Sequence, residues 1–397
     1  MKKNAFIIAE YNPFHNGHLY HINETRKAGA ECIIVLMSGN FVQRGECALF
    51  PKYERAEAAV HAGADLVLEI PMKYVIGGSA SFSLGAIKTA LATCSDGTLS
   101  FGAENEPSEL FCLADFLSLE STKDMIKCLC GQKGYSFPRA QCEVVKTELG
   151  EYYGEIMSRP NNLLAVHYIT DCKTLGAPFD FFAVKRIGAE HDSEHSESCF
   201  SSAMHLRKKI IYDIDGCKSF IPDFSFDIIS ECLKKGRFVS DKKFEIASLS
   251  RLQTLKQTDF ANVNGVNQGL ENLFYEASRK AISLDELCTS VKSKRFTYSR
   301  LRQVCLSAAL GVNRTDITKD ISFINVLAFN DVGRKILAQS KKSADVMMTG
   351  VLSNAKRLGE RSARDIEITE KAEMFYNLCM QNPEHNFSPY DFKPYVD

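Results

Sequence analysis

The sequence Ile7-Ile-Ala-Glu-Tyr-Asn-Pro-Phe-His-Asn-Gly-His18-Leu-Tyr20 joins a short apolar run to a helical pattern through a tight turn. The run Phe6–Ala9 has the length and composition of a buried strand. Asn12 and Pro13 are turn residues, and the segment His15–His18 then opens a predicted helix. Strand, turn and helix in this order form the repeating unit of a parallel α/β sheet.

The same unit recurs through the first half of the chain. Further apolar runs bounded by turn residues are Cys32–Met37, Leu66–Ile70, Thr98–Phe101 and Phe181–Val184. Helical patterns alternate with these runs and span His18–Ala28, Lys52–His61, Ser83–Ala92, Pro107–Leu119 and Asn161–Cys172. This alternation predicts an α/β fold with a Rossmann-like, doubly wound parallel sheet that helices cover on both faces.

The pattern changes at two places along the 397 residues, a length that fits two domains. Residues 121–158 interrupt the alternation and predict a helical insertion. After residue 215 strand-like runs become rare and helical periodicity dominates. We therefore expect a sheet domain over residues 1–215 and a mostly α-helical second domain over residues 216–397. The last dozen residues are expected to lie extended on the surface or to be disordered.

Composition excludes several classes of protein. Hydrophobic residues make up 45% and charged residues 24% of the chain, which excludes a disordered or fibrous protein. No apolar run reaches the roughly 18 residues of a membrane helix, and the N-terminus lacks the core of a signal peptide. The 14 cysteines contain no Cys-x-x-Cys and predict reduced, mostly buried thiols. We expect a cytoplasmic protein without a membrane partner.

Charge is unevenly distributed, although the whole chain carries a net charge of only −1. Residues 1–215 carry about −6 and residues 216–397 about +5. This asymmetry indicates an anionic partner for the second half. The alternative is a helical domain whose excess lysines have no such partner.

The first strand-to-helix turn has the chemistry of a phosphate site. Ligands of doubly wound sheets bind beyond the carboxyl ends of the strands, where a helix N-terminus offers free N–H groups. His15 and His18 are three residues apart on one helical face and can donate hydrogen bonds to phosphate oxygens. Gly17 leaves room for a nucleotide. The alternative is that ordinary local hydrogen bonds satisfy both histidines; a zinc site lacks a third ligand nearby.

His15-Asn-Gly-His18 resembles the His-x-Gly-His signature of the nucleotidyltransferase and class I aminoacyl-tRNA synthetase superfamily, whose members attack the α-phosphate of ATP. The superfamily's second motif is a hydroxyl-rich turn that ends in a basic residue. Phe200–Arg207 lies in the corresponding place but has Ala203 and Met204 where hydroxyl residues are common. The resemblance implies a HUP-type nucleotidyltransferase core. It also implies His15, His18 and Arg207 as catalytic residues.

A narrower resemblance, to the bacterial tRNA(Met) cytidine acetate ligase family, extends over most of the chain. It rests on the blocks Glu10–His18, Gly39–Gly45, Gly63–Glu69, Phe101–Glu104, Arg159–Asn162, Arg186–Asp192 and Lys294–Arg302. The resemblance implies that ATP activates acetate as acetyl-adenylate. The acetyl group then passes to N4 of the wobble cytidine of elongator tRNA(Met), so the implied partners are ATP, acetate and the anticodon loop of this tRNA.

The resemblance also implies the residues that bind ATP, with Mg²⁺ held mostly by the phosphates and water. They are Ile7, Ile8, Ala9, Glu10, Tyr11, Asn12, Pro13, Phe14, His15, Asn16, Gly17, His18, Leu19, Tyr20, Gly102, Asn161, Asn162 and Arg186. The residues of this set that follow Tyr20 each have an alternative, purely structural role. Gly102 could be a plain strand end, the two asparagines helix N-caps, and Arg186 a surface residue.

Two loops carry further polar residues. Gln43 and Arg44 follow the second predicted strand and are candidates for holding acetate or tRNA, and their spacing does not decide between the two. His191 and His195 lie in a polar loop that is more typical of solvated residues than of a metal site. Cys128, Cys130 and Cys142 lack zinc spacing as well, and we expect no structural metal.

A basic segment in the second half predicts RNA binding. Cations that neutralise phosphates, interleaved with aromatics that stack on bases, are typical of sites for unpaired RNA. The candidate tRNA-binding residues are Lys292, Lys294, Arg295, Phe296, Tyr298, Arg300 and Arg302. The alternative is a solvated helix start with two core aromatics.

Two other functions compete with an ATP-dependent tRNA ligase. A small-molecule adenylyltransferase shares the first domain but has no use for a basic helical second domain. A non-catalytic RNA-binding protein has no use for His15 and His18. The substrate requirement of ATP–pyrophosphate exchange distinguishes the three: acetate for the ligase, a nucleotide-like substrate for the adenylyltransferase, and no exchange for the binding protein.

Overall fold

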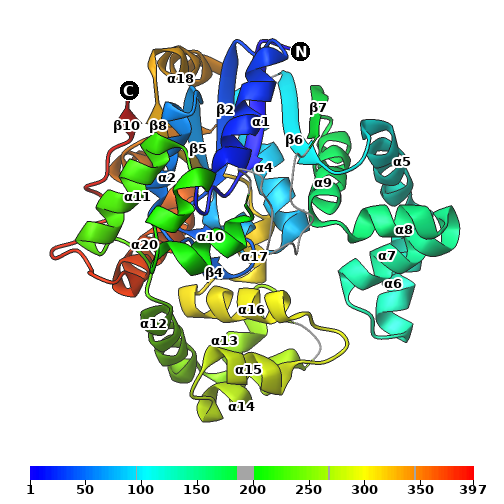
Figure 1. The fold of residues 1–397 in the computed structure, drawn as a ribbon. Coiled ribbons are helices and arrows are strands. Elements are labelled where there is room, and N and C mark those ends of the chain that lie inside the picture. Colours follow the sequence, from blue (N-terminus) through cyan, green and yellow to red (C-terminus); the bar gives the residue numbers. More distant parts are fainter. Residues whose placement is uncertain (95, 186–200, 267–268, 344–345) are drawn as a thin grey trace.

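A central β-sheet with helices on both faces organises the computed structural model, which describes residues 1–397 except 95, 186–200, 267–268 and 344–345 (Figure 1). Its strands are β1 (Asn4–Ala9), β2 (Cys32–Ser38), β5 (Leu66–Ile70), β6 (Gly97–Ala103), β7 (Phe179–Lys185), β8 (Phe323–Phe329), β9 (Met347–Thr349) and β10 (Tyr395–Val396). The order is β10-β8-β5-β2-β1-β6-β7, with β9 paired to β8. Strands β1, β2, β5, β6 and β7 are parallel, which confirms the predicted Rossmann-like sheet.

Helices pack on both faces of this sheet. The helices that contact its main strands are α1 (Asn16–Lys27), α2 (Lys52–His61), α4 (Ser79–Thr93), α9 (Pro160–Leu175) and α18 (Asp331–Ser343). Further helices flank this layer: α3 (Met72–Val75), α5 (Pro107–Ser118), α10 (Ala203–Ile210), α11 (Asp223–Lys235), α19 (Leu352–Ala355) and α20 (Glu360–Cys379), with 3-10 turns at Asp215–Phe220 and Lys356–Leu358. The predicted helix Lys52–His61 and strand Leu66–Ile70 have the observed bounds, and the other predicted elements of the sheet domain differ by a few residues at their ends.

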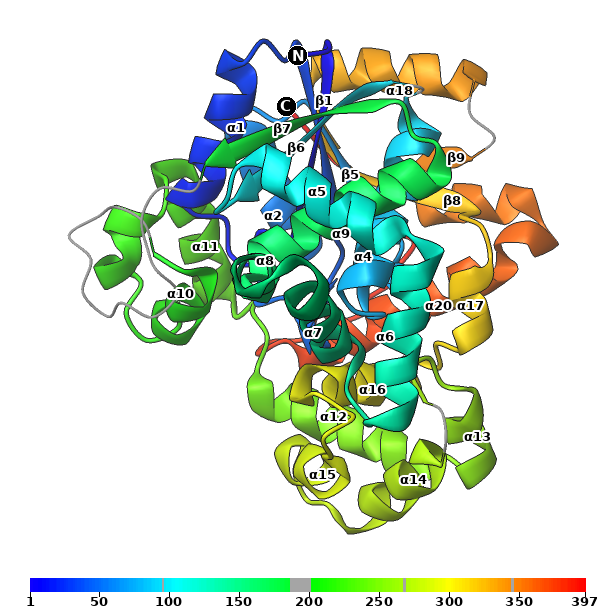
Figure 2. The same cartoon turned by 90° about the vertical axis from the view of Figure 1, so that its right-hand side faces the viewer.

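Two groups of helices lie outside the sheet layers (Figure 1). The insertion predicted at residues 121–158 consists of α6 (Glu120–Gln132), α7 (Phe137–Leu149) and α8 (Glu151–Ser158). The second group comprises α12 (Asp241–Thr254), α13 (Gln257–Asn262), α14 (Leu270–Lys280), α15 (Leu284–Val291), α16 (Tyr298–Leu310) and α17 (Arg314–Thr318). These helices confirm a helical region after the Rossmann-like core. Figure 1 and Figure 2 both place this second group at the opposite end of the molecule from α18.

The predicted division at residue 215 does not coincide with a boundary of the sheet. Strand β8 is antiparallel to β5, with Leu66 opposite Phe329 and Val67 opposite Ala328. The reason is that β5 needs a partner on its outer edge, and the apolar segment Phe323–Phe329 provides one that is largely buried. The chain therefore leaves the helical group and returns to the sheet. The C-terminal tail lies extended, and β10 pairs with β8.

Candidate active site

The first strand-to-helix turn lies where the direction of the sheet connections reverses. From β1 the chain proceeds to β2 on one side, and later to β6 on the other. Such a switch point is the usual ligand site of a doubly wound sheet. Helix α1 begins at Asn16, directly beyond the carboxyl end of β1, so its N-terminal N–H groups lie at this edge.

His15 and His18 cap helix α1 reciprocally. His15 is the N-cap, and its Nδ1 accepts a hydrogen bond from the backbone N–H of Gly17 at 3.1 Å. His18 Nδ1 accepts from the backbone N–H of His15 at 3.2 Å. The two rings stack with centroids 3.7 Å apart. Local hydrogen bonds, the simpler reading of the sequence, therefore exist, and both of these bonds are accepted by Nδ1.

These caps determine which nitrogen of each ring is a donor. A nitrogen that accepts a backbone N–H carries no proton, so the neutral tautomer of both rings has its proton on Nε2. Both side chains are thereby held as Nε2–H donors at the helix N-terminus. Gly17 is required by the same arrangement, because a Cβ there would lie 2.9 Å from His15 Cε1. The glycine makes room for the His15 ring itself, a reason that the sequence did not reveal.

The loop between β1 and α1 is fixed by contacts from other parts of the chain. Asn12 Oδ1 accepts from the Leu49 backbone N–H at 2.8 Å, and the Asn12–Pro13 peptide bond is cis. Arg207 Nη1 donates to the Asn12 carbonyl at 2.8 Å. Arg207 lies on α10, whose N-cap is Ser202. The structure thus brings Arg207 to the turn that carries the two histidines.

Arg55 is a site residue that the sequence reading missed. Its side chain is buried, donates from Nε to the Phe50 carbonyl at 3.0 Å, and reaches the carbonyls of Glu10, Ser38 and Gly39. One guanidinium therefore holds the carboxyl ends of β1 and β2 together. A signal was present, since a charged residue occupies the buried face of an otherwise alanine-rich helix.

Glu10 connects the site to the hairpin of β3 (Phe41–Val42) and β4 (Glu46–Cys47). Its Oε1 accepts the backbone N–H of Gln43 at 2.8 Å. Burial raises the pKa of Glu10, while this hydrogen bond and the nearby arginines, with Arg207 the strongest, act in the opposite direction. On the other side of the hairpin, Gln303 Nε2 on α16 donates to the Gln43 carbonyl at 2.6 Å. The helical group is thereby joined to the end of β1 through one residue.

Gly45→Ala is expected to separate this hairpin from α16. Gly45 has φ +77°, and a Cβ there would lie 2.5 Å from the Gln303 backbone nitrogen. We expect a loss of about 2–4 kcal/mol in the free energy of unfolding, because steric overlap adds to backbone strain. The KM for ATP should rise, since Glu10 loses its support. Urea unfolding and exchange kinetics measure both effects.

Gly176→Ala is the matched control. Gly176 also has positive φ, at +63°, but nothing lies within 4 Å of its Cβ position. This variant reports the backbone strain alone, on the order of 1 kcal/mol. Equal losses of stability and an unchanged KM in both variants would show that contact between the hairpin and α16 does not support the site.

The predicted ATP-binding residues that follow the first turn lie in strand β6 and at the start of helix α9. Gly102 lies in β6, paired with Val184 of β7. The N-cap of α9 is Arg159, so the N-cap alternative for the two asparagines is wrong. Asn162 is fully buried, and its amide bonds the Glu104 N–H, the Asn105 side chain and the Ile156 carbonyl.

Other predicted residues can be placed only in part. Asn161 is half-buried and donates to the Glu104 carboxylate, so of the two asparagines it remains the candidate. Arg186, His191 and His195 lie outside the described residues. Within the residues that are described, no group of three or more His, Cys, Asp or Glu side chains is arranged to hold a metal.

The predicted tRNA-binding residues divide into exposed and buried ones. Lys292, Lys294 and Arg295 are exposed in the turn between α15 and α16. The aromatics Phe296 and Tyr298 pack against the hydrophobic core. Burial raises the pKa of Tyr298 to about 12, and its hydroxyl donates to Asp285. Both rings are therefore half-buried at the edge of the core.

Arg300 and Arg302 are engaged within the protein. Arg300 Nη2 donates to the Gly265 carbonyl at 3.2 Å, and burial lowers the pKa of Arg300. Arg302 Nη1 lies 3.6 Å from Glu46 Oε1 on β4. Both guanidinium groups thus hold α16 to neighbouring segments.

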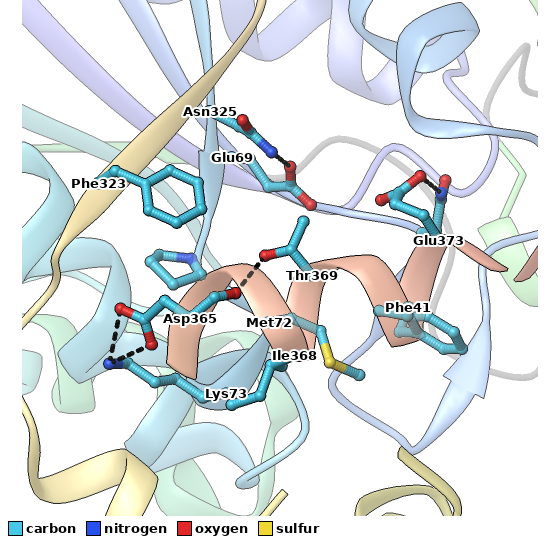
Figure 3. A pocket seen from close by; sticks show the side chains of 13 residues that line it. Phe41, Glu69, Met72, Lys73, Phe323, Asn325, Asp365, Ile368, Thr369 and Glu373 are labelled. Atoms are coloured by element: carbon cyan, nitrogen blue, oxygen red, sulfur yellow. Dashed lines mark hydrogen bonds and ion pairs between the residues drawn. The ribbon is translucent and has the colours of Figure 1, made fainter. Parts of the chain in front are cut away.

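A second polar cluster, also missed from the sequence, lies at the carboxyl end of β5, and Figure 3 shows three of its members, Glu69, Asn325 and Glu373. Lys52 is 1% exposed, and its Nζ lies 2.7 Å from both Glu69 Oε2 and Glu373 Oε1. Asn325 donates to Glu69 at 2.9 Å, and Asn40 donates to Glu373 at 2.9 Å. This cluster ties α2, β5, β8 and α20 together.

Known proteins resemble this chain over most of its length. The family described as HIGH Nucleotidyl Transferase matches residues 1–390. The tRNA(Met) cytidine acetate ligase of Thermoanaerobacter sp. (strain X514) is 34% identical over 365 residues, which cover 88% of this chain and 89% of that protein. The enzyme of the same name from Thermotoga maritima is 31% identical over 412 residues, covering 96% and 97%.

Solved structures extend the similarity to the fold. The crystal structure of Thermotoga maritima TmcAL bound with alpha-thio ATP superposes with a TM-score of 0.90 at 28% identity, covering 100% of this chain and 99% of that one. The apo form of the same protein gives a TM-score of 0.91. Among the described residues, no helix has the length and apolar character needed to cross a membrane.

Proposed function

The chain belongs to the tRNA(Met) cytidine acetate ligases among the HIGH nucleotidyl transferases, and we propose that it acetylates N4 of the wobble cytidine of elongator tRNA(Met) at the expense of ATP. In the first half-reaction a carboxylate oxygen of acetate attacks the α-phosphate, which forms acetyl-adenylate and releases pyrophosphate. In the second, the cytidine amine attacks the acetyl carbonyl, loses a proton and displaces AMP. Its substrates place such an enzyme in the cytoplasm.

The capped histidine pair is the observation that best supports this chemistry. His15 and His18 present Nε2–H donors at the N-terminus of α1, beside the switch point of the sheet. We assign them to oxygens of the α-phosphate, where negative charge develops as acetate attacks. Donors held in place before the reaction stabilise that charge without reorganisation. Glu10 and Asn12 act indirectly, by anchoring the hairpin and Arg207.

We assign Arg207 to the β- and γ-phosphates of the leaving pyrophosphate. Its hydrogen bond to Asn12 uses one Nη1 proton, so the rest of the guanidinium can take phosphate oxygens. Ser202 caps α10, and that helix N-terminus adds a second partial positive charge. Mg²⁺ enters with ATP in this proposal, held by phosphate oxygens and water.

The decisive experiment follows acetate in two assays on the purified full chain. Mass spectrometry of elongator tRNA(Met) incubated with protein, ATP and ¹³C-acetate should show one labelled acetyl group on the wobble cytidine. ATP–pyrophosphate exchange should require acetate but not tRNA. Exchange that requires a nucleotide-like substrate instead would indicate an adenylyltransferase. Binding of tRNA without any exchange would indicate a non-catalytic protein.

A further inference from the structure

We propose that the RNA surface is bipartite, formed jointly by the basic turn 292–295 and by the turn 133–139 of the helical insertion. This inference rests on the proposed function and specifies where its tRNA partner binds. The two turns are about 160 residues apart in the sequence, and neither family membership nor local pattern connects them. The partner chemistry is an RNA loop with unpaired bases and a charged backbone.

Direct contact brings the two turns together. A Cβ placed on Gly134 would lie 3.4 Å from Arg295 Nε and 3.6 Å from Arg295 Cγ, so the Arg295 side chain lies against the glycine. Gly134 has φ +62°, which a glycine adopts without strain. Burial raises the pKa of the Cys130 thiol on α6, and the positive charge of Arg295 acts in the opposite direction.

The joined turns form a surface of one charge. Residues 125–142 and residues 287–315 contain no aspartate or glutamate, although the chain has 49 acidic residues. The exposed cations of the two turns are Lys133, Arg139, Lys292, Lys294 and Arg295. Exposed cations attract phosphates at long range and release counterions on binding.

The insertion also supplies an exposed aromatic ring, which the basic turn lacks. Phe296 and Tyr298, like Tyr135 of the insertion, are half-buried against the core. On the insertion, the Phe137 side chain is 52% exposed. The ring of Tyr135 lies beneath two cations, with Arg139 Cζ 4.1 Å and Lys133 Nζ 5.9 Å from its centroid. Aromatic rings beside cations are the usual platform for unpaired bases.

The test compares two double variants of the full chain that each remove two exposed lysine or arginine charges from the insertion. Lys133→Ala/Arg139→Ala removes charge from the proposed surface. Lys123→Ala/Lys127→Ala is the matched control, because these α6 lysines pair with Glu120 and Asp124. The affinity for an unmodified elongator tRNA(Met) transcript is measured across a KCl series. The first variant should lower the magnitude of the log–log salt slope by about 1.5 units, and the control should leave it unchanged.

A third variant, Phe137→Ala, tests base stacking without a change of charge. It should weaken tRNA binding by about 5- to 150-fold at an unchanged salt slope.

Wild-type affinity in both Lys133→Ala/Arg139→Ala and Phe137→Ala would overturn the bipartite surface, as would equal losses in the control. Acetate-dependent exchange in the absence of tRNA should stay near wild type in every variant. If the wild-type protein shows no acetate-dependent exchange, the proposed function is refuted. The measurements of tRNA affinity test the bipartite surface independently of that result.

Discussion

His18→Asn should lower acetate-dependent ATP–pyrophosphate exchange by about 10²–10³-fold, since it removes one preorganised donor from the phosphate site. Asparagine places Oδ1 near the position of Nδ1, so it can still accept the His15 backbone N–H and keep the cap on α1. The Nε2–H donor is absent. The free energy of unfolding should therefore remain close to wild type while the half-reaction is lost.

Two further variants separate capping from catalysis. His18→Gln puts an amide donor near the position of Nε2, and it should recover part of the exchange while weakening the cap. His18→Ala removes both functions, so exchange should be lost and stability should fall by about 0.5–2 kcal/mol. Wild-type exchange in a folded His18→Asn protein would assign His18 to the cap alone.

The sequence predicted the sheet well because its signals are local. Each buried parallel strand is a short apolar run, and the bounds of Leu66–Ile70 agree with the structure. Strand β8 was missed for a different reason. It pairs with a strand more than 250 residues earlier, in the antiparallel direction, and follows a long helical region. Hydrophobic periodicity indicates that a segment is buried, but does not reveal which edge it pairs with.

The candidate active site was also predicted only in part. The two histidines stand out because their spacing and the turn before them are both local. The tautomer that makes them donors depends on backbone hydrogen bonds, which sequence does not show. Arg300 reads as a cation for RNA, but in the fold it bonds a backbone carbonyl. Whether a charged side chain faces solvent or the protein depends on tertiary packing, and sequence pattern alone rarely decides it.

Lys52→Met is expected to cost about 3–5 kcal/mol in the free energy of unfolding, the typical result of removing one partner from a buried ionic cluster. Burial opposes the charge of Lys52, yet Glu373 and Glu69 together raise the pKa of this lysine above its usual value. Methionine fills a similar volume but leaves two carboxylates facing each other at the carboxyl end of β5. Urea unfolding at neutral pH measures the loss.

The pH dependence of this loss identifies its cause. Burial, with Glu69 nearby, already raises the pKa of Glu373, and removal of the Lys52 charge raises it further. The folded variant then binds more protons than the unfolded chain at mildly acidic pH, so its stability must fall as pH rises. The deficit relative to wild type should be smaller at about pH 5 than at about pH 8. Lys52→Met/Glu69→Gln/Glu373→Gln, which lacks the paired carboxylates, should recover most of the stability at neutral pH and lose the added pH dependence. A deficit that is the same at both pH values would mean that lost packing, and not unpaired charge, causes it.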